Sequence, residues 1–335
     1  MTTTTAPSSV STFQRKPIPV ALRCVFGAVF YGILRPAVSV MNRLGLADRM
    51  IGQAHVRQRN GAIKRPPFGA YVPNEHDVIV ATYAKSGTNW MMQIAHQLAF
   101  HGKAEFDHIH NFVPWPDSPQ PMGKYAIPVG DPTVWMASPE QKRVIKTHLD
   151  WDLIPYSASA RYIIVIRDPK DVFVSNFHFM KSVTGVGFPR DLWYRLFVNG
   201  KSPVGGSWVA NTALYWEQRR KPNVLVLSFK SMKQDLPGTV RKVADFMNVR
   251  VPDSVIQEVS EKASFGYMKK IDHKFGVWKM FPWGPEPTMI RKGGQGGSSE
   301  LLSRDEQREM DTKFMAELKQ RNSDFPYQEF CDVVS

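Results

Sequence analysis

Residues Asp77–Trp90 read DVIVATYAKSGTNW and decide the fold of this chain. The run Asp77–Tyr83 is short, apolar and rich in β-branched residues, which is typical of a strand buried on both faces of a parallel sheet. The pattern that follows predicts a helix over Thr88–Phe100. A strand joined to a helix by so short a loop is half of a βαβ unit, so this stretch predicts an α/β fold.

The loop between this strand and this helix has the composition of a phosphate site. The first amides of a helix are unpaired and carry partial positive charge, so they attract anions. Gly87 allows close approach of the backbone, Lys85 supplies a full charge, and Ser86, Thr88 and Asn89 supply neutral donors. The lysine precedes the glycine, unlike the order of a Walker A loop. An ordinary turn in which Ser86 or Thr88 caps the helix is the alternative.

The rest of the chain extends the alternation of strands and helices. Further strands are expected at Arg143–His148, Tyr162–Ile166 and Val224–Phe229, and helices at Lys170–Lys181, Val209–Arg219, Leu236–Met247 and Ser303–Gln320. This order predicts an α/β protein with a P-loop-like central parallel sheet and helices on both faces. Two stretches rich in Gly, Pro and aromatic residues, Lys181–Gly206 and His273–Ser299, are expected to be irregular lids over a site.

Two more segments suit an anion. Arg167 follows the predicted strand Tyr162–Ile166, so it lies at the edge where open α/β sheets bind ligands, and Ser175 is placed to face the same crevice. A guanidinium with a hydroxyl fits a terminal phosphate, although an ion pair between Arg167 and Asp168 or Asp171 is an equally good explanation. The third segment, Arg291–Gly297 (RKGGQGG), is either a flexible phosphate nest or a solvated basic loop.

Composition favours an anionic ligand and excludes several kinds of site. The formal net charge of +13 favours anionic ligands or surfaces. Cys24 and Cys331 are the only cysteines, which excludes a disulfide scaffold and a cysteine-based zinc site and favours a reducing compartment. No HExxH motif or convincing carboxylate ligand pattern is present, so no metal is expected.

The N-terminal region is expected to be separate from the main α/β domain. We expect a disordered tail over residues 1–14, an apolar basic appendage over 15–60, and the main domain over 61–335. Only 11 residues separate Arg23 from Arg35, fewer than the roughly 20 that a spanning helix needs, and Pro36 is expected to kink or end a helix. A helix packed on the domain, an interfacial helix on an anionic membrane and a poor signal anchor remain open.

Taken together, these residues resemble the sulfotransferases that use 3′-phosphoadenosine-5′-phosphosulfate (PAPS), of the cytosolic type. Tyr83–Trp90 (YAKSGTNW) resembles the 5′-phosphosulfate loop, Arg167–Ser175 (RDPKDVFVS) the 3′-phosphate motif, and Arg291–Gly293 (RKG) the segment that closes on that phosphate. Lys146–Leu149 (KTHL) resembles the segment that carries the catalytic histidine. The resemblance extends over roughly residues 65–330. The sequence departs from the family pattern at three places. The Asp and Trp that usually follow RKG are missing, Phe229 stands where a tyrosine is common, and no dimer motif is recognisable around Glu300–Asp311.

The resemblance implies a role for each matching residue. PAPS would be held by Lys85, Ser86, Gly87, Thr88, Asn89, Trp90, Arg167, Ser175, Phe229, Phe265, Arg291, Lys292 and Gly293, with no metal. His148 would be the general base, Lys85 would stabilise the leaving phosphate, and Lys146 and Ser175 would assist. Without the resemblance, His148 is as well explained as a structural histidine.

The implied activity is sulfuryl transfer to a hydroxyl of a hydrophobic small molecule or lipid. Candidate walls of the acceptor pocket are His108–Pro116, Trp151, Phe177, Phe179 and the aromatic run Phe275–Trp283, each of which is also explained as plain core. The chain is expected in the cytoplasm, either free or peripheral to an anionic membrane. A nucleotide-dependent kinase, or a non-catalytic binder of anions or nucleic acid, is the alternative; no helix-turn-helix or RNA-binding sheet motif supports nucleic acid as a partner.

Overall fold

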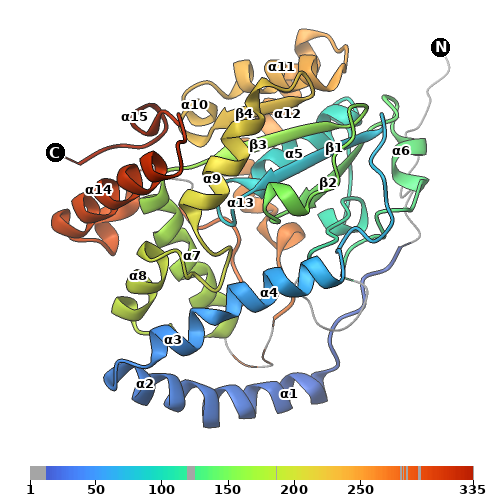
Figure 1. The fold of residues 1–335 in the computed structure, drawn as a ribbon. Coiled ribbons are helices and arrows are strands. Elements are labelled where there is room, and N and C mark those ends of the chain that lie inside the picture. The colour runs from blue at the N-terminus through green and yellow to red at the C-terminus, as the bar shows by residue number, and fades with distance from the viewer. Residues whose placement is uncertain are drawn as a thin grey trace.

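The core of the molecule is a four-stranded parallel sheet (Figure 1). The structure, a computed structural model, describes residues 13–118, 125–185, 187–279, 281, 283, 286–292 and 296–334. Its strands are β1 (Asp77–Thr82), β2 (Arg143–Thr147), β3 (Arg161–Ile166) and β4 (Val224–Ser228), in the order β2-β1-β3-β4. Each lies within one residue of the stretch that the sequence predicts, because an unbroken apolar run leaves little choice of boundary.

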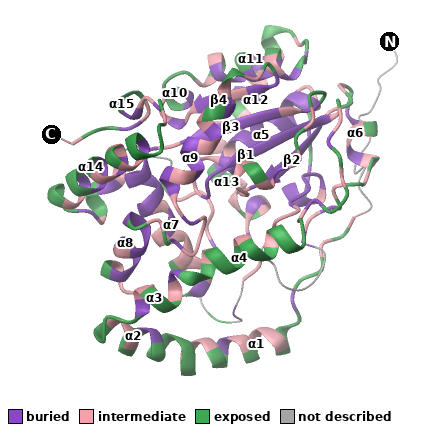
Figure 2. Cartoon of the chain, in the orientation of Figure 1, coloured by how far each residue is buried: buried purple, intermediate pink, exposed green. Residues whose placement is uncertain are grey.

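Alternate residues of β1 pack into two separate cores, one on each face of the sheet. Val78 and Val80 pack against α5 (Thr88–Ala99), α11 (Leu236–Met247) and α12 (Asp253–Lys262). Ile79 and Ala81 pack with α7 (Pro169–Thr184), α9 (Trp208–Glu217) and α14 (Arg304–Gln320). Strands β1 and β2 are accordingly buried throughout and β3 nearly so, whereas β4 is partly exposed (Figure 2). This confirms the predicted α/β class with helices on both faces.

The shorter elements connect these layers. They are α6 (Thr133–Ala137), α8 (Arg190–Val198), α10 (Phe229–Gln234), α13 (Phe265–Lys270) and α15 (Tyr327–Phe330), with the 3₁₀ turns η2 (Ile109–Asn111), η3 (Trp151–Leu153), η4 (Gln218–Arg220), η5 (Asp272–Phe275) and η6 (Gly297–Glu300). In the described part of His273–Ser299, only short 3₁₀ turns form, in line with the irregular segment expected there.

The prediction that Lys181–Gly206 is irregular was wrong, because α8 lies within it. Leu192 and Leu196 of α8 pack against Val38 and Ala47 of the N-terminal helices. Trp193, Tyr194 and Phe197 face the opposite core. Six of its nine residues are buried, so the polar side of α8 is reduced to Arg190, Asp191 and Arg195 and is narrower than that of a typical surface helix.

The N-terminal region forms one long helix followed by a helical return. Helix α1 (Val20–Val29) continues through a π-helical turn, η1 (Phe30–Leu34), into α2 (Arg35–Arg43), and α3 (Ala47–Ile51) and α4 (Gln53–Lys64) run back above it (Figure 1). Pro36 lies in the first turn of α2 and does not end the helix, since the wider π turn before it removes the need for a regular hydrogen bond at the proline. The helix therefore continues past both Arg23 and Arg35, and the 11-residue spacing between them does not limit its length. Residues 1–12 of the expected tail lie outside the described residues.

Helix α1–α2 is attached along one side only. The Arg23 guanidinium donates to the Phe281 carbonyl (2.9 Å), the Tyr31 hydroxyl donates to the Thr184 carbonyl, and the rings of Phe30 and Phe281 lie 5.0 Å apart. Only 6% of the most apolar 18-residue stretch of this helix is buried. Figure 2 likewise shows the helix largely exposed. By length and composition alone, the 24 residues Val20–Arg43 can cross a membrane.

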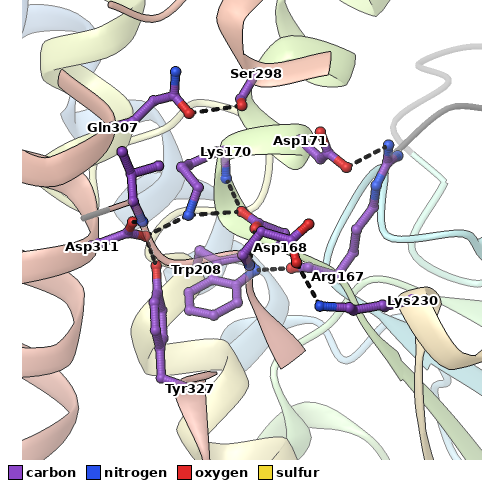
Figure 3. Close-up of polar contacts among 12 residues, drawn as sticks. Arg167, Asp168, Lys170, Asp171, Trp208, Lys230, Ser298, Gln307, Asp311 and Tyr327 are labelled. Carbon is purple, nitrogen blue, oxygen red and sulfur yellow. Dashed lines mark hydrogen bonds and ion pairs between the residues drawn. The ribbon is translucent and has the colours of Figure 1, made fainter. Parts of the chain in front are cut away.

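A buried ionic network joins the start of α7 to the C-terminal end of the chain (Figure 3). The Lys170 ammonium pairs with Asp311 (2.5 Å) and Asp168 (3.4 Å), and Tyr327 donates to Asp311 (2.7 Å). Asp168 also caps α7 by accepting the Lys170 amide. The network fixes the turn that carries Arg167, the residue immediately before Asp168.

Candidate active site

A single cavity of about 630 Å³ lies at the carboxyl ends of all four strands. Lys85 follows β1, His148 follows β2, Arg167 follows β3 and Phe229 follows β4, and all four side chains line it. This is the edge at which open α/β sheets bind ligands. The other predicted residues that line the cavity are Gly87, Thr88, Asn89, Trp90, Lys146, Ser175, Phe265, Arg291 and Lys292.

The loop after β1 is shaped to expose the start of α5. Gly87 is the N-cap, with φ +108°, and no side chain caps the helix, so the alternative of an ordinary turn capped by Ser86 or Thr88 is not what forms. A Cβ at Gly87 would lie 2.8 Å from the Phe229 ring, so the position needs glycine for space as well as for conformation. The Thr88 hydroxyl instead pairs with that of Thr82 (2.6 Å), which leaves the first amides of α5 to other partners.

Ser86 is the predicted loop residue that does not reach the cavity. Its side chain is fully buried and its amide donates to the Tyr83 carbonyl (3.1 Å). Its hydroxyl is buried and has no hydrogen-bond partner among the described residues, so a role of Ser86 in binding the ligand stays a prediction. Gly293 lies outside the described residues.

Three cations in the cavity lie over aromatic rings. The Lys85 ammonium is 4.3 Å from the centre of the Phe179 ring, that of Lys146 is 3.4 Å from Trp115, and the Arg167 guanidinium is 4.4 Å from Phe229. Burial lowers the pKa of Lys85 to about 8, helped by nearby Arg167, and that of Lys146 to about 7. Removal from water penalises the charged forms, and an anion placed between them would restore the protons.

The sequence left open whether Arg167 faces the ligand crevice or forms an ion pair, and in the structure its side chain has both positions at once. It lines the cavity, and it also lies 3.5 Å from Asp171 and donates to the Lys85 carbonyl (3.2 Å). Asp168 pairs with Lys170 instead (Figure 3). The Asp171 contact thus positions Arg167 without removing it from the cavity.

His148 is held with one ring nitrogen engaged. Nδ1 lies 2.9 Å from the Thr82 carbonyl, which can only accept, so the proton is assigned to Nδ1 and Nε2 carries the lone pair. Burial, together with the nearby charges of Lys146 and Lys85, lowers the pKa of His148 to about 3. The ring stands edge-on to Trp115 with centres 5.6 Å apart. The arrangement presents a neutral imidazole whose Nε2 is able to accept a proton.

Asp117 is a cavity residue that the sequence reasoning missed. Its carboxylate accepts the His148 amide (2.9 Å), and it is the largest favourable charge acting on Lys146. Burial raises the pKa of Asp117. It directly follows the aromatic segment His108–Pro116, so extending that segment by one residue was the available signal.

Arg291 and Lys292 reach the cavity while paired to one carboxylate. Glu300 accepts from Arg291 (2.8 and 2.9 Å) and from Lys292 (2.9 Å), and His178 lies 2.8 Å away. These partners lower the pKa of Glu300 to about 2. Glu300 therefore pairs with the same two cations, Arg291 and Lys292, that the sequence predicts to bind a phosphate.

Trp90 and Phe265 form an aromatic end of the cavity. The Trp90 indole donates to the Ala263 carbonyl (2.7 Å), which fixes its plane, and Phe265 at the start of α13 is nearly half exposed. A planar base fits between two such rings.

The candidate acceptor aromatics divide between cavity and core. Trp115, Phe179 and Val277 line the cavity. Most of the rest pack elsewhere: His108, His110, Phe275 and Phe281 are buried, and Trp151 packs against Tyr162 with ring centres 5.1 Å apart. Among the described residues, no group of His, Cys, Asp or Glu is arranged to hold a metal ion.

Known sequences match this chain through its central region. The family model described as the sulfotransferase domain matches residues 75–320. Human sulfotransferase 1C2 is 30% identical over 205 residues, which are 58% of this chain and 66% of that enzyme. Luciferin sulfotransferase of Photinus pyralis is 31% identical over 212 residues, 58% of this chain and 57% of that enzyme. The match thus spans less than two thirds of the length of each of these relatives, 66% and 57%.

Solved structures show the same fold. A retinol dehydratase in complex with androsterone and the inactive cofactor PAP superposes with a TM-score of 0.61 at 19% identity, covering 77% of this chain and 84% of that one. A mouse sulfotransferase in complex with PAP gives 0.56 at 24% identity, covering 78% and 90%. With a family match over most of its length, the chain belongs to the sulfotransferase family.

Proposed function

We propose that this protein transfers the sulfuryl group of PAPS to a hydroxyl of a hydrophobic small molecule or lipid. The observation that carries the proposal is the convergence of Lys85, Arg167 and Arg291, from three remote segments, on the cavity that also holds His148. A ligand with phosphates at two ends needs cations at two ends, and the aromatic pair Trp90 and Phe265 leaves room for its base.

The proposed reaction needs no covalent intermediate. The acceptor oxygen forms a bond to sulfur as the bond from sulfur to the 5′-phosphate oxygen breaks, and PAP leaves. His148 Nε2 takes the acceptor's proton, Lys85 offsets charge on the leaving phosphate, and Lys146 stabilises the group in transfer. Lys85 and Lys146 lower the pKa of His148 through their positive charges. Bound PAPS is negatively charged and offsets these charges, so PAPS raises the pKa of His148 above its value in the empty cavity.

His148→Ala tests the proposed chemistry. We expect turnover of radiolabelled PAPS to fall at least about 100-fold, while the Kd for PAP changes less than about threefold. His101→Ala is the control, because His101 pairs with Glu140 away from the cavity. Near-normal turnover by His148→Ala would remove it as the base, and stabilisation by ATP with Mg²⁺ in place of PAP would favour the kinase alternative.

The proposal includes a membrane-peripheral protein in the cytoplasm, with residues 15–60 as the docking appendage. Val25, Ile33, Leu34 and Val40 are exposed on helix α1–α2. No acidic residue occurs between positions 15 and 47, whereas Arg23, Arg35 and Arg43 are spread along the helix. An exposed apolar helix that carries only positive charge is suited to the surface of an anionic bilayer.

Ile33→Asp with Leu34→Asp tests membrane docking. We expect the double variant to lose most of its cosedimentation with vesicles of phosphatidylserine and phosphatidylcholine, with no change in PAP binding. Val72→Asp is the control for an exposed apolar residue off this helix. Equal sedimentation of all three proteins would overturn docking, and release of the wild type only by detergent would indicate that the helix spans.

A further inference from the structure

Helix α4 contributes one face to the cavity, although it precedes the region 75–320 that the family model matches. His55, Gln58, Arg59 and Ala62 line the cavity, and their spacing of three, four and seven residues places them on one side of the helix. Arg59 on this face pairs with Asp150 and Asp152 of the segment after β2, which also carries His148. This face therefore borders the end of the cavity where the acceptor would lie.

Two contacts fix α4 in this position. Arg59 donates to Asp150 (2.5 Å) and also pairs with Asp152, while Asp150 accepts from Asn211 (3.0 Å). The His55 ring packs on the backbone of Gly206, where a Cβ would lie 2.2 Å from it. An ion pair two residues from His148 ties the helix to the catalytic segment, so the face is built and not a chance approach.

The polar groups on this face differ in their availability. Arg59 is engaged by two carboxylates. Gln58 is an exposed residue at the edge of the cavity. Nδ1 of His55 is buried and has no hydrogen-bond partner among the described residues. Burial lowers the pKa of His55, and Arg59 opposes the raising effect of Asp150, so the imidazole is neutral. The available groups are an amide and an imidazole, both uncharged.

We propose that His55 and Gln58 of α4 are specificity-determining residues that bind a second, neutral oxygen group of the acceptor. The inference rests on the proposed function and adds the acceptor class: an apolar body with a hydroxyl at His148 and a second hydroxyl or carbonyl toward α4. A carboxylate is disfavoured because Asp117 and Asp150 line the same end. A neutral oxygen fits both an amide and an imidazole.

The test compares 2,6-naphthalenediol with 2-naphthol, which differ only in the second hydroxyl. Calorimetry on the PAP-loaded full chain should show that the wild type binds the diol about three- to tenfold more tightly. His55→Ala with Gln58→Ala should remove this preference while the Kd for PAP stays unchanged, and His55→Asn with Gln58 intact should retain most of it. Gln53→Ala, on the exposed side of α4, should behave as wild type.

Each outcome decides the proposal. Equal binding of the two probes to the wild type, including no detectable binding of either, overturns it, as does a diol preference that survives in His55→Ala with Gln58→Ala. Failure of the proposed function shows differently, as loss of PAP binding or of PAPS turnover in the wild type. A variant that fails to fold is recognised by its failure to bind PAP, and His55→Asn then carries the comparison.

Discussion

Lys85 and Lys146 are the two cavity cations that lose charge close to neutral pH. Burial is the main cause in both cases, and it leaves the pKa of Lys85 at about 8 and that of Lys146 at about 7. Arg167 is treated as charged throughout, because a guanidinium is not deprotonated in proteins. The empty site is thus most positive on the acid side of neutrality.

This charge balance predicts the pH dependence of PAP binding. PAP binds the protonated lysines, so its affinity should be highest near pH 6 to 7 and fall by about tenfold or more between pH 7 and 9 as the lysines of the free protein deprotonate. Binding should take up protons in the same range. Calorimetry in buffers of different ionisation enthalpy measures both quantities.

Lys85→Arg is the matched variant for this prediction, because it keeps the charge at all these pH values. The part of the decline near pH 8 should disappear while the part near pH 7, from Lys146, remains. An affinity for PAP that is flat from pH 7 to 9 in the wild type would contradict the prediction.

At the scale of elements, the segment between η5 and α14 is held partly by Glu300. The carboxylate at the end of η6 bridges Arg291, Lys292 and His178. A phosphate at this site would compete with Glu300 for the same donors. The carboxylate therefore lowers the affinity for an anion while it keeps the two cations near the cavity.

Glu300→Gln should tighten PAP binding by up to about fivefold, since partly exposed ion pairs contribute about 1 kcal/mol or less. The gain should shrink at high salt, which screens exposed charge. Glu317→Gln makes the same change of charge in α14, where Glu317 pairs with Arg321, and should leave PAP affinity unchanged. Weaker binding by Glu300→Gln would show instead that Glu300 is needed to position the segment.

At the scale of the whole molecule, the network around Lys170 joins segments that are far apart in the chain. Lys170 and Asp311 are both almost fully buried, and the backbone amides of Asp332 and Val334 donate to Asp168 (2.8 Å) and Asp311 (3.0 Å) (Figure 3). The C-terminal end of the chain is thereby attached beside the turn that bears Arg167. Removing one partner leaves charge buried without compensation.

Lys170→Met should lower the free energy of unfolding by about 3–5 kcal/mol at pH 7, measured by urea denaturation. Burial already raises the pKa of Asp168, and Lys170 opposes that rise, so loss of the ammonium raises the pKa of Asp168 further above that in the unfolded chain. The folded variant then binds more protons, so its deficit should shrink as the pH falls toward 5.

The control for Lys170→Met is Lys230→Met, which breaks a partly exposed pair with Asp332 (2.5 Å). Its effect should stay below about 1 kcal/mol. Equal effects of the two substitutions would contradict the assignment of Lys170 as the centre of the network.

The sequence could predict what is encoded by neighbouring residues. The four strands are found within one residue of their expected ends, because each is an unbroken apolar run bounded by polar residues. The placement of Lys85, Arg167 and His148 at one edge followed from the rule that parallel strands present their carboxyl ends together. Helix α8 was missed because it is short and six of its nine residues are buried, which leaves only a narrow polar side as a local signal.

What the sequence by itself determined is the α/β class, the parallel sheet and the set of cationic loops that mark a sulfotransferase. Only the tertiary structure decided that Arg59 pairs with Asp150, that Glu300 occupies the cations of the RKG segment, and that His55 faces the cavity. Strand formation depends on side chains a few residues apart, whereas these contacts join residues from elements whose packing depends on the whole fold. No local pattern records which distant charge a side chain meets once water is excluded.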